Sequence, residues 1–194
     1  MAKVIIVHGW AGSPKEAMHA WMKAELEKKG FEVIVPKMPD SETPKIEKWV
    51  PFLQKTVGDP DENTYFIGHS IGCQTVMRYL EALDPSIEIG GAVFIAPWMK
   101  LDENAIKEEG EESVKIVKPW VETPINFSKI KKHTNNFLCI FSNNDLYVPF
   151  KDSEIFKEKL GAKIIVERNK GHFTETDGVK ENKAAVDGLL DLMM

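Results

Sequence analysis

The sequence predicts an α/β domain with a parallel sheet, and three observations carry this prediction. Six apolar runs alternate along the chain with segments of helical periodicity. Each run is almost continuously apolar, which is typical of strands buried on both faces of a parallel sheet. The chain has 194 residues, a usual length for one domain. We therefore expect a single domain over residues 1–194, with a six-stranded sheet covered by helices on both faces.

The expected strands are the six apolar runs, at residues 4–7, 31–35, 64–67, 87–95, 137–141 and 163–166. The helix after the first strand carries both start and stop signals. Ser13 is the expected N-cap, Pro14 fits the first helical position, and Glu16 would close a capping box. Gly30 follows the end of this helix. Its apolar stripe, which should face the sheet, consists of Met18, Trp21, Met22 and Leu26.

Four further helices are expected between and after the later strands. Residues 45–57 have an amphipathic pattern, and Pro51 should kink this helix. The next helix begins near Ile71, directly after the third strand. The last two cover residues 150–160 and 179–192. Together these patterns give the alternation of strands and helices that a parallel sheet requires.

Composition and charge narrow the possible partners. The chain contains 25 Lys and Arg and 30 Asp and Glu, for a formal net charge of −5. A nucleic-acid binder would need a basic face, so we expect no nucleic-acid partner. Cys73 and Cys139 lie in apolar segments without metal-ligand spacing and are expected to be reduced thiols. No apolar run has the length of a signal or membrane segment, so we expect a cytoplasmic protein without a membrane partner.

The most informative pattern lies at residues 64–73, where an apolar strand leads through G-x-S-x-G directly into an amphipathic helix. In a nucleophile elbow this turn is strained, and Gly68 and Gly72 are needed because a Cβ there would meet neighbouring backbone. The turn would expose the hydroxyl of Ser70 at the start of the helix, where free N–H groups can stabilise a negative charge. The alternative is that Ser70 only caps the helix, within a pattern that arises by chance.

A nucleophilic serine needs a histidine base and an orienting acid, and on such an elbow the expected chain order is Ser, Asp, His. Asp145 follows the expected strand 137–141, and His172 follows the next one. Each stands at the carboxyl edge of the sheet, where open α/β sheets bind ligands. Asp102, after the fourth strand, is the reserve acid. The alternatives are a turn-forming role for Asp145 and a solvated loop position for His172.

The backbone N–H groups of Trp10 and Ile71 are the expected oxyanion hole, one in the loop after the first strand and one directly after the serine. Residues 98–132 contain no strand pattern, and we interpret them as an excursion beside the active face. Trp10, Trp98 and Trp120 fall in segments that should overhang the serine, where they would wall an apolar substrate pocket. Ordinary core packing is the alternative for Trp98 and Trp120.

The other histidines are expected to have structural roles. His8 should order the loop after the first strand, and His69 should pack or form hydrogen bonds. His19 and His133 are expected at the surface. Three histidines at strand ends, His8, His69 and His172, could imitate a zinc site. No pair with H-E-x-x-H spacing is present, however, so we expect neither a metal nor a cofactor.

A further set of motifs is spread along most of the chain: His8-Gly9, the segment 21–31 (WMKAELEKKGF), Met38-Pro39-Asp40, Trp49-Val50-Pro51-Phe52, the GHSIGC segment 68–73, Pro119-Trp120, Asp145 with Val148-Pro149, and Gly171-His172-Phe173. Together they resemble the small lidless serine hydrolases of the α/β-hydrolase superfamily. The resemblance implies a minimal hydrolase sheet with strand order 2-1-3-4-5-6 and the family's catalytic triad at Ser70, Asp145 and His172. Trp10 and the charged stretch 102–118 depart from the animal members, so the substrate pocket is not carried over.

We therefore expect a serine hydrolase that cleaves small carboxylic esters or amides through an acyl-enzyme. In this mechanism Ser70 attacks, His172 carries the proton and Asp145 fixes the imidazole. Two other functions stay open on the sequence: a protein-interaction scaffold with vestigial catalysis, and an acyltransferase that uses the same residues. The complete set of catalytic residue types favours an enzyme, because a fold alone does not require them.

Overall fold

The computed structural model describes residues 2–194. Within them lies a six-stranded parallel sheet with the order β2-β1-β3-β4-β5-β6, which confirms the predicted fold class and strand order. The strands are β1 (Lys3–Val7), β2 (Glu32–Ile34), β3 (Thr64–His69), β4 (Gly91–Ile95), β5 (Phe137–Ser142) and β6 (Lys163–Glu167).

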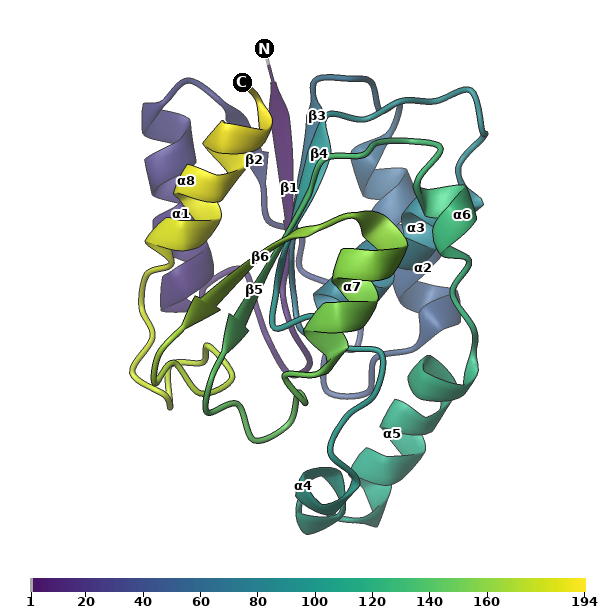
Figure 1. Cartoon of the computed structure of the whole chain (residues 1–194), viewed down its shortest axis with the longest axis vertical. Helices are drawn as coiled ribbons and strands as arrows, with labels where there is room; N and C mark the ends of the chain where they lie inside the picture. Colours follow the sequence, from purple (N-terminus) through teal and green to yellow (C-terminus); the bar gives the residue numbers. More distant parts are fainter. Residues whose placement is uncertain (1) are drawn as a thin grey trace.

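Helices cover both faces of this sheet. They are α1 (Ala17–Lys28), α2 (Ile46–Val57), α3 (Ile71–Ala82), α4 (Glu103–Glu108), α5 (Glu111–Glu122), α6 (Phe127–Ile130), α7 (Asp152–Leu160) and α8 (Lys183–Leu192). Figure 1 shows α1 and α8 on one face and α2, α3, α6 and α7 on the other. No helix within residues 2–194 combines the length and apolar character needed to cross a bilayer.

The central strands β3, β4 and β5 are buried along their whole length, as their continuous apolar patterns predict. β6 differs because it is an edge strand that pairs only with β5. Val166 in β6 is 45% exposed. The expectation that every apolar run is buried on both faces is therefore wrong for β6.

The start of α1 also differs from the expectation. The helix begins at Ala17, and Ser13 lies in the turn before it instead of at the N-cap. The carboxylate of Glu16 lies 2.8 Å from His19 Nδ1, so it does not close a capping box. Glu175, from a loop near the other end of the chain, accepts a hydrogen bond from the N–H of Ala17 at 2.6 Å. A distant carboxylate thus satisfies a helix N–H that the local sequence was expected to satisfy.

Two histidines that were expected at the surface are buried. His19 is 1% exposed and His133 is 2% exposed. His133 Nδ1 lies 2.7 Å from the carbonyl oxygen of Ile87, and the carbonyl of His133 accepts from the N–H of Ile89. Ile87 and Ile89 thus pair with His133 and not with a neighbouring strand. As a result β4 begins at Gly91, whereas the sequence predicted a start at residue 87.

Residues 98–132 carry three helices and no strand. α6 packs against α3 and α7 in the layer that covers the sheet. α4 and α5 instead pack chiefly on each other, and Figure 1 shows them projecting beyond the carboxyl ends of the strands. Only the part of this segment around α4 and α5 therefore stands beside the carboxyl edge.

Candidate active site

Ser70 occupies a strained turn between β3 and α3. Its backbone angles are φ 52° and ψ −117°, a region that residues with a Cβ rarely adopt. The two neighbouring glycines are required by close backbone contacts. A Cβ on Gly72 would collide with the carbonyl oxygen of Val7, and a Cβ on Gly68 would lie 2.8 Å from the backbone of Cys73. The turn therefore has the geometry of a nucleophile elbow.

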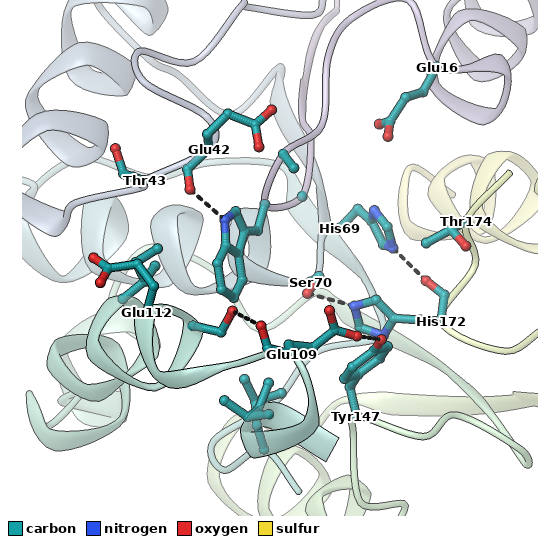
Figure 2. Close-up of a pocket in the computed structure, with 17 residues that line it drawn as sticks. Glu16, Glu42, Thr43, His69, Ser70, Glu109, Glu112, Tyr147, His172 and Thr174 are labelled. Carbon is teal, nitrogen blue, oxygen red and sulfur yellow. Dashed lines mark hydrogen bonds between the residues drawn. The ribbon is translucent and has the colours of Figure 1, made fainter. Parts of the chain in front are cut away.

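His172 lies between Ser70 and Asp145 (Figure 2 draws the contact with Ser70). Its Nε2 is 2.8 Å from Ser70 Oγ, and its Nδ1 is 2.8 Å from Asp145 Oδ2. The Asp145 side chain is 2% exposed, and its other oxygen accepts from the N–H groups of Tyr147 and Val148. Because Nδ1–H donates a hydrogen bond to the carboxylate, Nε2 is the nitrogen that can accept the serine proton. The structure thus brings together the three side chains that the sequence singled out.

The reserve acid lies elsewhere. Asp102 is exposed and caps α4, where its Oδ1 accepts from the N–H groups of Asn104 and Ala105, both at 3.0 Å. A carboxylate in this position stabilises the start of the helix, and this capping role accounts for Asp102.

The main chain of His172 is held as firmly as its side chain. Its N–H donates to Asp177 Oδ2 at 2.9 Å, and its carbonyl oxygen lies 2.8 Å from His69 Nε2. The residues on either side, Gly171 and Phe173, have φ angles of 52° and 60°. His69 therefore forms a hydrogen bond, as expected, and the bond leads directly to the loop of the candidate base.

The expected oxyanion donors lie at the same edge of the sheet, one in the loop after β1 and one at the start of α3. Ile71 is the first residue of α3, so its N–H has no acceptor within the helix. The loop that carries Trp10 is fixed by its neighbours: Ala11 N–H donates to Ser41 O at 2.8 Å, and Trp10 Nε1 donates to Glu42 O at 2.9 Å. The oxyanion role of both N–H groups stays a prediction.

A cavity of about 490 Å³ opens above Ser70 and His172 (Figure 2). Its apolar wall comes from the loop after β1 and from the α4–α5 region, through Trp10, Ala11, Leu101, Ile106 and Ile116. The sequence indicated this region only as an excursion. The signal that could have identified the wall was the presence of Ile106 and Ile116, each on a helix rich in charged residues.

Of the three tryptophans expected in this pocket, only Trp10 lines the cavity. Trp98 and Trp120 are each 1% exposed and lie in the core. The carbonyl of Trp98 accepts from Gln74, whereas Trp120 Nε1 donates to Pro44 O at 3.0 Å. Both side chains are therefore packed in the core, which was the alternative to a place in the pocket wall.

The polar lining of the cavity is acidic. It contains Glu16, Glu42, Glu109 and Glu112 and neither lysine nor arginine. The hydroxyl of Tyr147 donates to Glu109 Oε1 at 2.6 Å, and its ring packs edge-on against His172 with a centroid distance of 5.3 Å. This hydrogen bond, together with burial and nearby carboxylates, raises the pKa of Tyr147 to about 12. No sequence motif indicated Tyr147 or Glu109.

Other candidate chemistries find no support in the geometry. Cys73, next to the elbow, is completely buried, and burial raises the pKa of its thiol well above its usual value. Across residues 2–194, no group of three or more His, Cys, Asp or Glu side chains is arranged to hold a metal ion.

The comparisons with known proteins agree with this geometry. The serine hydrolase family model matches residues 4–189. YdeN of Bacillus subtilis is 26% identical over 176 residues, which cover 91% of this chain and 88% of that protein. The serine hydrolase RBBP9 of Rattus norvegicus is 27% identical over 175 residues, which cover 89% of this chain and 82% of that protein.

Two solved structures have the same fold. The crystal structure of the ydeN gene product from B. subtilis superposes with a TM-score of 0.89 at 24% identity, covering 99% of this chain and 98% of that chain. Est1E from Butyrivibrio proteoclasticus, solved with ferulic acid bound, has a TM-score of 0.74 at 17% identity, covering 100% of this chain and 90% of that chain.

Proposed function

The chain belongs to the serine hydrolase family, and from this premise we propose that it hydrolyses small carboxylic esters or amides through an acyl-enzyme on Ser70. The observation that carries the proposal is the continuous hydrogen-bonded path from Ser70 Oγ through His172 to Asp145, with both contacts at 2.8 Å. A hydroxyl in this position can lose its proton to the imidazole as it attacks.

In the first half of the reaction, Ser70 Oγ bonds to the substrate carbonyl carbon while its proton moves to His172 Nε2. The carbonyl oxygen becomes an oxyanion, which the N–H groups of Trp10 and Ile71 would bind. Asp145 orients the ring and stabilises the imidazolium that forms. The intermediate then expels the leaving group, which takes the proton from His172, and Ser70 keeps the acyl group.

In the second half, water attacks the acyl carbon and gives its proton to His172. The new intermediate releases the carboxylic acid, and the proton returns from His172 to Ser70 Oγ. The 490 Å³ cavity supports a small or medium acyl group, because pockets for small molecules begin at roughly 300 Å³. The ferulic acid bound to Est1E has a size and apolar ring compatible with such a cavity.

A fluorophosphonate probe and p-nitrophenyl acetate test this proposal together. We expect the probe to label Ser70 and the Ser70→Ala variant to lose at least about a thousandfold in kcat, because triad members act as a unit. Ser113→Ala is the matched control, since Ser113 lines the same cavity but bonds to the carbonyl of Glu109. Turnover by Ser70→Ala within tenfold of wild type would refute the mechanism. Probe labelling without turnover of any ester or amide would favour the scaffold alternative.

A further inference from the structure

Buried histidine rings lie in a row behind the proposed base. Ring centroids are 5.7 Å apart between His19 and His69, and 5.4 Å apart between His69 and His172. His19 is 1% exposed and His69 is 5% exposed. The proposed reaction uses neither ring. Burying two polar rings beside the site is costly unless their nitrogen atoms form hydrogen bonds, so their partners have to be identified.

The proton of His69 can be assigned from its partner. Nε2 of His69 lies 2.8 Å from the carbonyl oxygen of His172, and a carbonyl oxygen can only accept a hydrogen bond. Nε2 therefore carries a proton and donates it to this bond. Burial, together with the neighbouring histidines, holds the pKa of His69 well below its usual value, so the ring is neutral. Its Nδ1 is consequently an acceptor.

The bond from His69 completes the set of partners of His172, since every polar atom of its side chain and main chain is then engaged. The loop needs this support. Phe173, the next residue, has a φ of 60°, which is strained for a residue with a bulky side chain and persists only when surrounding contacts hold it. Loss of the donor would let the loop relax and move the imidazole relative to Ser70.

A small cavity adjoins His69. It has a volume of about 10 Å³, close to the least that holds one water molecule, and Glu16, His19 and His69 are among the residues that line it. Nδ1 of His69 and Nε2 of His19 are both buried without a hydrogen-bond partner in the described part of the chain. His19 Nδ1 lies 3.4 Å from the carbonyl oxygen of Ser13 and 2.8 Å from Glu16 Oε2, and because both oxygens can only accept a hydrogen bond, Nδ1 carries a proton.

We propose that His69 is a positioning residue for His172, and that one water molecule in the small cavity bridges Nδ1 of His69 and Nε2 of His19. Donors and acceptors then match along the whole path. His19 Nδ1–H faces the carbonyl oxygen of Ser13 and the carboxylate of Glu16, the water donates one hydrogen bond to each histidine, and His69 Nε2–H donates to the carbonyl of His172. The inference rests on the role proposed above for His172 as the base.

The kinetic test compares two substitutions of His69, with p-nitrophenyl acetate as substrate. His69→Leu removes the donor, and we expect kcat to fall about 10- to 100-fold with KM within about threefold, because a shift of about 1 Å in a catalytic group has effects of this size. His69→Gln places an amide N–H near the position of Nε2 and should stay within about fivefold of wild type.

His133→Leu is the matched control. His133 is also buried, and its Nδ1 pairs with the carbonyl of Ile87, but it lies before β5, at the edge of the sheet opposite the candidate site. We expect this variant to lose stability and to keep its kcat. If His133→Leu lowered kcat as much as His69→Leu, the effect would belong to lost stability, and the positioning role would be refuted.

Nitrogen NMR of the histidines in the wild-type protein gives a second readout that does not depend on the folding of any variant. We expect His69 to be protonated on Nε2 and bare on Nδ1 from about pH 6 to 8, and a crystal structure to show water between His69 and His19. Wild-type kcat in His69→Leu or a protonated Nδ1 would overturn the positioning role, and an empty cavity would overturn the water bridge. Full activity of Ser70→Ala would instead refute the proposed function itself.

Discussion

Replacing Ser70 by glycine should leave the protein more stable than replacing it by alanine, and both changes remove the proposed nucleophile. With φ 52° and ψ −117°, Ser70 lies in a region where a residue with a Cβ is strained by about 1–3 kcal/mol. Glycine has no such strain, but it increases the conformational entropy of the unfolded chain, which costs about 0.5–1 kcal/mol. The balance is a gain of about 1 kcal/mol in the free energy of unfolding.

Ser70→Ala is the reference for this measurement. Alanine keeps the Cβ and therefore the strain, and both variants lose the hydrogen bond between Ser70 Oγ and His172. For a chain of this length, about 1 kcal/mol raises Tm by about 2–4 °C. Urea unfolding with an unchanged m-value measures the difference directly. A glycine variant no more stable than the alanine variant would show that the turn does not carry the strain that its angles indicate.

Three further substitutions test other parts of the site. Asp145→Asn should lower kcat on p-nitrophenyl acetate about a thousandfold or more, because the amide favours the wrong imidazole tautomer. The control Asp102→Asn should keep kcat within twofold of wild type. The reverse result would assign the role of the acid to Asp102. Gly72→Ala should lose more than about 3 kcal/mol in urea unfolding, since its Cβ meets a β1 carbonyl; a wild-type value would contradict this packing. Glu109→Gln should improve kcat/KM for p-nitrophenyl esters with a carboxylate on the acyl chain, relative to neutral esters, by about three- to tenfold. Glu108→Gln, next to the cavity wall but outside it, should leave that ratio unchanged.

Much of the fold and the central geometry of the site could be predicted because the signals are local. Continuous apolar runs identify buried parallel strands without knowledge of their neighbours. The elbow is encoded by adjacent residues, Gly68, Ser70 and Gly72, which suit one strained turn. Asp145 and His172 could be located because parallel strands bring all their carboxyl ends to one edge of the sheet.

The incorrect expectations concern residues whose environment depends on distant parts of the chain. His19 and His133 are polar enough for the surface, but each finds an acceptor that allows burial. Trp98 and Trp120 fit a core as well as a pocket wall, and the path of residues 98–132 decides between them. The N-terminus of α1 depends on Glu175, 158 positions away from the N–H that it accepts.

Two separate parts of the chain form the cavity, and the part that forms much of its apolar wall can change without the other. The side chains of the proposed triad belong to loops that follow β3, β5 and β6, whereas much of the apolar wall belongs to α4 and α5, which pack chiefly on each other outside the sheet. Sequence change, insertion or grafting in α4 and α5 would therefore alter the shape of the cavity while the sheet and the elbow keep their geometry. Divergent evolution and laboratory engineering of acyl selectivity can both act on this segment, with Trp98 and Trp120 as the fixed points at which a new wall has to be attached.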